Sequence, residues 1–134
     1  MTLPKYLYIN KTSSQASRVT IFANTLTIDM GGIPYNEMKI HQAAINSQNN
    51  YDIPLIRFVG GVGYAADFKT PVAAVLPDVK VTTAEWAYRT VDSNNPKFSN
   101  MNNRQHISFE FEESDGGLIP IDDLDSLVLL LELT

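Results

Sequence analysis

The feature of the sequence that most constrains the fold is the apolar run at residues 127–131, which reads LVLLL. An apolar residue stands at every position, so the run lacks the alternation of a strand with one face in water. The run is also far shorter than the roughly 20 residues that a helix needs to cross a bilayer. It therefore predicts a strand in the middle of a sandwich, covered by protein on both faces.

The segment upstream of this run alternates strictly. Ile107, Phe109 and Phe111 lie on one side of it, and Ser108, Glu110 and Glu112 lie on the other. A period of two residues is typical of a strand with one buried and one solvated face. The Asp-Gly-Gly sequence at residues 115–117 then predicts a hairpin turn.

Short strand-like runs, separated by Gly, Pro and Asn, account for most of the remaining chain. They lie at residues 6–9, 18–30, 35–46, 53–59, 72–76, 79–81 and 84–91. The run at 18–30 changes phase near Asn24, which predicts a bulge or a break. Residues 35–46 fit helical spacing as well as strand spacing, and we assign a strand because the neighbouring segments are strands.

Roughly eight short strands and no clear helix predict an all-β fold, an antiparallel β-sandwich. No linker divides residues 1–134, so we expect a single domain. The strand spacing does not distinguish a jelly roll from an immunoglobulin-like Greek key. A count of about eight strands favours the jelly-roll type.

Composition excludes several classes of function. The chain has 10 Lys and Arg against 15 Asp and Glu, a formal net charge of -5, which argues against a nucleic-acid partner. It has no cysteine, so disulfides and thiolate metal sites are excluded. The first ten residues show no basic segment followed by an apolar run, and we expect a soluble protein that does not insert into a membrane.

Three groups of residues imitate chemical sites. The sequence from Gly61 to Ala66 matches a glycine-rich dinucleotide fingerprint, but Pro71 follows too soon for the helix it needs, so we interpret it as a bulged turn. A cluster of carboxylates lies near the C-terminal end of the sequence: Glu110, Glu112, Glu113, Asp115, Asp122, Asp123 and Asp125. We assign these residues to a solvated strand face and to turns. The alternative interpretation is a calcium site, because Ca²⁺ binds several oxygen ligands. The two histidines, His41 and His106, are too few for a zinc site or a catalytic triad. We expect no enzyme activity, catalytic residue, metal or cofactor.

Binding surfaces are expected on loops and exposed aromatic residues. The longest predicted loop, residues 92–104, is rich in Asn, Ser and Pro, and long loops on β scaffolds commonly bind partners. Trp86 and Tyr88 are spaced as a sugar-stacking platform would be, although a core position for Trp86 fits general burial habits better. A carbohydrate-binding module or receptor-binding spike domain is thus the alternative function.

Two parts of the chain resemble small capsid proteins of membrane-containing and virophage-like double-stranded DNA viruses. One part is PKYLYINKTSSQASRVTIFANTLTI followed by YNEMKIHQAAI and IPLIRF, and the other is HISFEFEESDGGLIPIDDLDSLVLLLEL. Together they cover roughly half the chain, whereas residues 60–104 match no pattern of that family. The resemblance is one of residue types along successive strands rather than of signature residues.

What the resemblance implies is a single jelly-roll capsid component of the virion, either the vertex penton or a minor capsid protein. Its partners would be copies of itself, in a trimer or a pentamer, and other capsid proteins. The N-terminal segment, the strand that holds Trp86 and the Asn-rich loop are then the expected contact surfaces. The candidate interface residues are Lys5, Tyr6, Tyr8, Trp86, Tyr88, Lys97 and Phe98.

Overall fold

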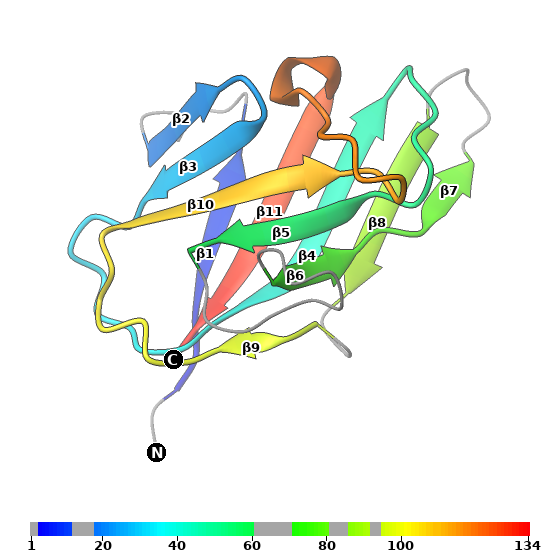
Figure 1. Ribbon diagram of the computed structural model, residues 1–134. Helices are drawn as coiled ribbons and strands as arrows, with labels where there is room; N and C mark the ends of the chain where they lie inside the picture. Colours follow the sequence, from blue (N-terminus) through cyan, green and yellow to red (C-terminus); the bar gives the residue numbers. More distant parts are fainter. Residues whose placement is uncertain (1–2, 12–17, 61–70, 81–85, 92–94) are drawn as a thin grey trace.

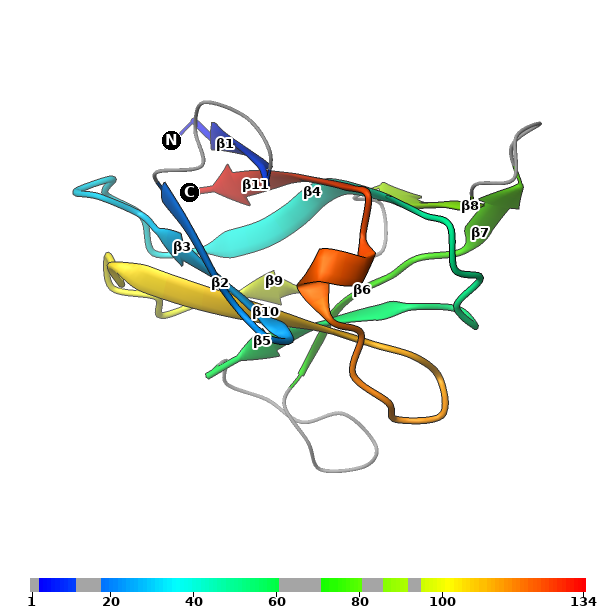
Figure 2. The ribbon, with the colours of Figure 1, turned by 90° about the horizontal axis from the view of Figure 1, so that it is seen from above.

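A computed structural model describes residues 3–11, 18–60, 71–80, 86–91 and 95–134. Within these ranges the chain forms eleven β-strands and one short 3-10 helix, η3 (Ile121–Asp123). The strands make two antiparallel sheets that pack face to face (Figures 1 and 2), which confirms the predicted all-β sandwich. The described ranges contain no helix of the length and hydrophobicity that crossing a bilayer requires.

The larger sheet, called sheet A, has the strand order β1–β11–β4–β8–β7. Its strands are β1 (Lys5–Asn10), β11 (Ser126–Leu133), β4 (Met38–Ser47), β8 (Trp86–Val91) and β7 (Asp78–Lys80). A short strand, β9 (Lys97–Phe98), pairs with the start of β4 on the same side as β8. The apolar strand β11 is thus hydrogen-bonded on both edges, in the middle of the sheet.

The smaller sheet, called sheet B, has the order β2–β3–β10–β5–β6. Its strands are β2 (Val19–Phe22), β3 (Thr25–Asp29), β10 (His106–Glu112), β5 (Leu55–Val59) and β6 (Val72–Val75). The alternating strand β10 lies at its centre, with Ile107, Phe109 and Phe111 facing the core. β11 presents Leu127, Leu129, Leu131 and Leu133 to the same core from sheet A.

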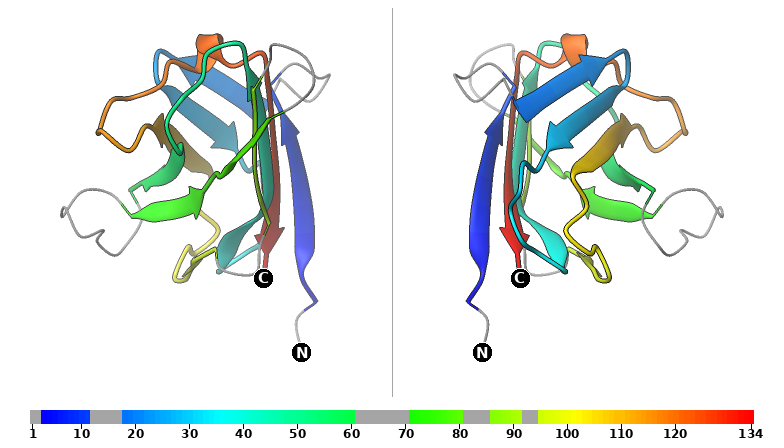
Figure 3. Two further views of the ribbon diagram at one scale, coloured as in Figure 1. Left: turned by 90° about the vertical axis from the view of Figure 1, so that its right-hand side faces the viewer. Right: turned by 90° about the vertical axis from the view of Figure 1, so that its left-hand side faces the viewer.

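The strands pair in a nested order. β1 pairs with β11, β3 with β10, β4 with β8, and β5 with β6. The chain is therefore arranged as one long hairpin. β5 and β6 lie next to its turn, and the first and last strands, β1 and β11, pair with each other. Successive pairs fall in different sheets, which lie on the two sides of the sandwich (Figure 3).

Two irregularities in the sequence pattern have structural causes. The phase change near Asn24 is a break, because Ala23 adopts a φ of 53° in the tight turn between β2 and β3. The segment that fitted both helix and strand is the bulged strand β4. Its register against β11 shifts between Leu130 and Leu131, so the buried Ile40 and Ala43 are three residues apart, a spacing that imitates a helix.

The turn at residues 100–104, the described end of the Asn-rich loop, closes one end of the sandwich. The Asn103 side chain accepts a hydrogen bond from the Tyr35 N–H at 2.7 Å, and the Asn103 N–H donates to the Tyr35 carbonyl at 2.9 Å. The Asn102 N–H donates to the Asn36 side chain at 3.1 Å. Asn102 and Asn103 also have positive φ, which asparagine tolerates better than most residues. The described asparagines of this turn thus serve the fold.

One expected solvent-facing glutamate is buried. Glu112 and Arg57 lie on the outer side of sheet B, yet each side chain is only 6% exposed. Arg57 donates to the two carboxylate oxygens of Glu112 at 2.6 and 3.2 Å. The sequence interpretation was wrong for Glu112, because β-strand alternation gives the side of the sheet and cannot reveal a buried partner on the neighbouring strand.

At the opposite end, the hydroxyl of Tyr88 holds the loop between β4 and β5. It accepts a hydrogen bond from the Tyr51 N–H at 2.5 Å. It also lies 2.9 Å from the Tyr51 carbonyl and 3.1 Å from the Asn50 side-chain oxygen, either of which accepts its proton. Burial raises the pKa of the Tyr88 phenol, which therefore remains a donor at neutral pH.

We predict that Tyr88→Phe lowers the free energy of unfolding by about 1–3 kcal/mol, because it leaves the Tyr51 backbone without its buried partner. Tyr51→Phe is the matched control. It removes only the hydroxyl contacts of Tyr51 near the surface, to Asp123 and Asn49, so its cost is expected below about 1 kcal/mol. Urea denaturation of both variants measures the difference, and equal losses would show that the Tyr88 network does not hold this loop.

Candidate interaction surface

The outer face of sheet A carries apolar side chains that the strand register places next to one another. One row across the sheet consists of Tyr8, Leu130, Gln42 and Val91. The next row consists of Asn10, Val128, Ala44 and Arg89. Five of these eight side chains are apolar or aromatic: Tyr8, Leu130, Val91, Val128 and Ala44. We call these five the apolar band.

Much of the apolar band is open to solvent. Val91 is 60% exposed and Tyr8 is 44% exposed, while Val128 and Leu130 are half-buried. No described strand or helix packs over this side of the sheet (Figure 3). The prediction that β11 is covered on both faces is therefore not met within the described residues. Only its inner face is covered, and its burial alternates residue by residue.

The band forms the floor of a shallow hollow of about 540 Å³, which Gln42 and Arg89 also line. A second hollow, of about 630 Å³, adjoins it where β6 and β8 approach at the side of the sandwich. Arg89 and Val91 line both hollows. The exposed apolar surface thus continues from the face of sheet A around to this side of the molecule.

Charged and aromatic side chains border the band toward the end of the sheet where the C-terminus lies. Glu132 is opposite Lys39, which is in turn opposite Lys97 on β9. The hydroxyl of Tyr6 donates to Glu132 at 3.3 Å, and the Tyr6 ring packs edge to face on His41, with ring centroids 5.2 Å apart. Polar groups around an apolar centre are the usual composition of a protein interface.

The outer face of sheet B differs in character. On β3 and β10 the outward residues are polar or charged, and Thr27 and Ser108 are hydrogen-bonded at 2.8 Å across these two strands. On β5 and β6 some outward residues are apolar, such as Leu55 and its partner Val75, which is 47% exposed. The largest exposed apolar residue there, Phe22, is 82% exposed at the edge strand β2. Among the described residues, the outer face of sheet A carries apolar residues across four adjacent strands, whereas that of sheet B is polar on β3 and β10.

The structure divides the predicted interface residues into two groups. Tyr6 and Tyr8 are exposed on the outer face of β1, and Lys5 and Lys97 are exposed nearby. Tyr88 and Phe98, which are 0% and 7% exposed, belong to the core, and Trp86 packs against it. Residues that lie opposite each other on paired strands point to the same face of the sheet. Tyr88 is opposite the buried Ile45 and Phe98 is opposite the buried Met38, so both side chains point into the core. Neither Tyr88 nor Phe98 offers surface to a partner.

Sequence reasoning missed Val91, Val128 and Leu130. The signal was present in the apolar run, which has too many apolar residues for a strand with one covered face. We interpreted the run as a strand covered on both faces by other parts of the same chain. A sequence does not show whether a second layer of the chain covers the outer face of a sheet.

The loop end of the molecule is acidic. Around the β4–β5 and β10–β11 loops and the start of β7 stand Asp52, Asp78, Glu113, Asp115, Asp122, Asp123 and Asp125. Burial and the hydrogen bond from its hydroxyl to Asp123 both raise the pKa of Tyr51. Lys11 is a basic side chain that reaches this end, where it donates to the carbonyls of Ile121 and Leu124.

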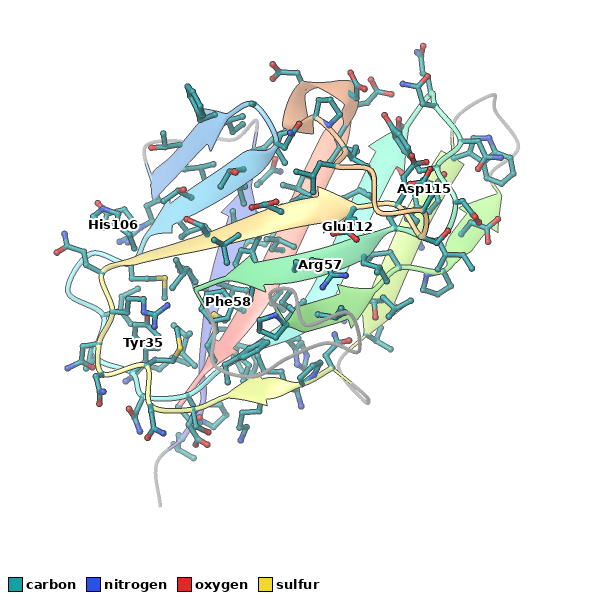
Figure 4. The ribbon with its side chains drawn as sticks, in the orientation of Figure 1. Tyr35, Arg57, Phe58, His106, Glu112 and Asp115 are labelled. Carbon is teal, nitrogen blue, oxygen red and sulfur yellow. The ribbon has the colours of Figure 1, made fainter. Side chains whose placement is uncertain are left out.

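These carboxylates do not form a metal site in the described ranges, where no three His, Asp or Glu side chains are grouped to hold an ion. Asp115 instead accepts a hydrogen bond from the Gly117 N–H at 2.8 Å within the predicted hairpin turn (Figure 4). Both histidines lie on strands, His41 half-buried and His106 exposed. The glycine-rich sequence at residues 61–66 lies outside the described residues.

In comparisons with known proteins, no family model, no curated protein and no solved structure matches this chain.

We predict that Leu130→Lys leaves the protein folded, with a loss of less than about 1 kcal/mol, because the outward side chain can reach water. Leu129→Lys, one position away on the same strand, places an ammonium in the core and is expected to cost more than about 4 kcal/mol. Thermal and urea unfolding compare the two variants. Equal destabilisation would mean that the outer face of β11 is covered within the monomer.

Proposed function

We propose that this protein is a viral capsid component with a jelly-roll fold, which associates with copies of itself through the outer face of sheet A. The observation that carries the proposal is the apolar band. A cluster of Tyr, Leu, Val and Ala side chains spread over four adjacent strands is costly to expose, and exposed apolar patches mark interaction sites.

The nested strand pairing supports the jelly-roll assignment. A jelly roll is a long antiparallel hairpin of eight strands wrapped into a two-sheet sandwich, so that its first strand pairs with its eighth, its second with its seventh, and so on inward. The four nested pairs here follow that order when β2, β7 and β9 are treated as additions. The same fold also serves lectins and cupins, so the capsid role rests on the surface and on the sequence resemblance.

Charge complementarity favours a second copy of the chain as the partner of this face. The border of the apolar band includes the basic residues Lys39, Arg89 and Lys97 against two glutamates, Glu132 and Glu37, and Glu37 lies 4.0 Å from the Lys97 ammonium. The loop end of the molecule is strongly acidic, with Asp52, Asp78 and the carboxylates of the β10–β11 loop. A contact between the face of one copy and the loop end of the next is heterologous, and such contacts form a ring when the rotation between copies closes.

A ring of three or five copies is the capsomer that we expect, as a vertex penton or as a minor capsid protein in contact with other capsid subunits in the virion. The alternative of a carbohydrate-binding module loses its platform, because Tyr88 is buried and Trp86 packs against the core.

We predict that Val91→Glu raises the dissociation constant for self-association at least about tenfold, which corresponds to about 1.4 kcal/mol. Val91 is 60% exposed at the centre of the two hollows, so a carboxylate there would be desolvated on association without disturbing the monomer. Light scattering over a range of concentration gives the mass and the dissociation constant.

Phe22→Glu is the matched control, since it introduces the same charge at an exposed apolar residue on sheet B. It is expected to leave the dissociation constant within about twofold of that of the natural chain. A protein that stays monomeric at every concentration, or equal effects of the two variants, would contradict the proposal.

A further inference from the structure

Ile53, in the loop between β4 and β5, has a backbone conformation that does not suit its side chain. Its φ is 35°, in the left-handed region that a β-branched residue rarely enters. Asparagine or glycine adopts this conformation with less strain. Burial does not account for the isoleucine either, since the residue is 49% exposed. Strained residues of this kind are held by the structure around them, and they cluster at functional sites.

Hydrogen bonds on both sides hold the backbone around Ile53. Before it, the Ser114 N–H donates to the Asp52 carbonyl at 3.2 Å, and the Ser114 hydroxyl donates to the Asp52 carboxylate at 2.8 Å. After it, the Leu76 N–H donates to the Pro54 carbonyl at 2.9 Å. The fold therefore presents an aliphatic side chain to solvent from a fixed backbone, which lowers the entropy that is lost when a partner binds it.

The hollow on the outer face of sheet A combines small residues with a positive charge. Ala43 and Ala44 both line it. Ala44 stands between the larger Val128 and Arg89 in its row across the sheet. Arg89 is exposed and forms no ion pair with another described residue. The hollow can therefore take an aliphatic side chain that arrives with a carboxylate beside it.

Ile53 is accompanied by carboxylates of this kind. Asp52, Ile53 and Asp78 line one depression at the loop end of the molecule. An apolar side chain that fills a hollow on its partner is the usual centre of an interface, and opposite charges beside it fix the orientation of the two partners.

We propose that Ile53 of one copy inserts into the hollow over Ala44 of the next copy and places Asp52 against Arg89. The inference rests on the proposed function, because it names the residues that make the heterologous contact of that proposal. A second copy is the occupant that charge complementarity favours, since one chain carries both the acidic apolar projection and the basic apolar hollow.

The first test compares Ile53→Asn with Leu118→Asn. Ile53→Asn removes the aliphatic side chain and relieves the backbone, so the urea midpoint of dilute protein is expected to stay the same or to rise. The dissociation constant for self-association, measured by light scattering, is expected to rise at least about tenfold. Leu118, which is 42% exposed at the same end, provides the matched control, and its variant is expected to stay within about twofold of the natural chain.

The second test changes the shape and the charge of the contact. Ala44→Leu fills the hollow and is expected to raise the dissociation constant at least about tenfold, whereas association through unspecific apolar contact would become tighter. Asp52→Arg and Arg89→Asp are each expected to weaken association. The double variant is expected to associate at least about tenfold more tightly than either single variant. Circular dichroism checks that every variant is folded.

Equal dissociation constants for Ile53→Asn and Leu118→Asn, tighter association of Ala44→Leu, or a double charge variant no tighter than the single ones would overturn the insertion. If Val91→Glu still weakens association in that case, the proposed function stands without it. A protein that never associates would overturn both.

Discussion

The structure depends on a strand that is apolar on both faces but covered on one. β11 is hydrogen-bonded to β1 and β4, and its four inward leucines meet the aromatic residues of sheet B in the core. Burying a side chain such as leucine is worth about 1.5–3 kcal/mol, so these contacts anchor the sandwich. The same strand leaves Val128 and Leu130 on a face that the described chain does not cover. In the proposed association, a second copy of the chain covers this face.

Many polar groups at the two ends of the sandwich and on sheet B are hydrogen-bonded within the fold. At one end, asparagine side chains and backbone groups of the 100–104 turn bond to Tyr35 and Asn36. At the other end, Tyr88 holds the β4–β5 loop. On sheet B, Arg57 and Glu112 satisfy each other. Loops are the usual binding elements of β proteins. In the described ranges, the two loops named above are held by contacts within the fold. Exposed apolar residues lie on strands, as Tyr8 and Val91 do, and also outside them, as Leu3 and Ile53 do.

Sequence periodicity predicted the strands and the sandwich, because alternation reports directly which side of a sheet a residue occupies. It also located the break near Ala23 and the central position of β11. It failed where the answer depends on distant residues. Tyr88 and Phe98 were assigned to an interface although their cross-strand partners place them in the core. Glu112 was assigned to solvent because its partner, Arg57, is 55 residues away in the sequence.

The most direct test uses the absence of cysteine from the natural chain. The variant Leu130→Cys places a single thiol on the outer face of sheet A, and its rate of reaction with a thiol reagent reports whether that face is covered. Fast reaction in dilute protein and slow reaction in concentrated protein is the predicted result, since the face is open in one copy and buried between copies. A rate that is slow even in dilute protein, or fast at all concentrations, would contradict the account.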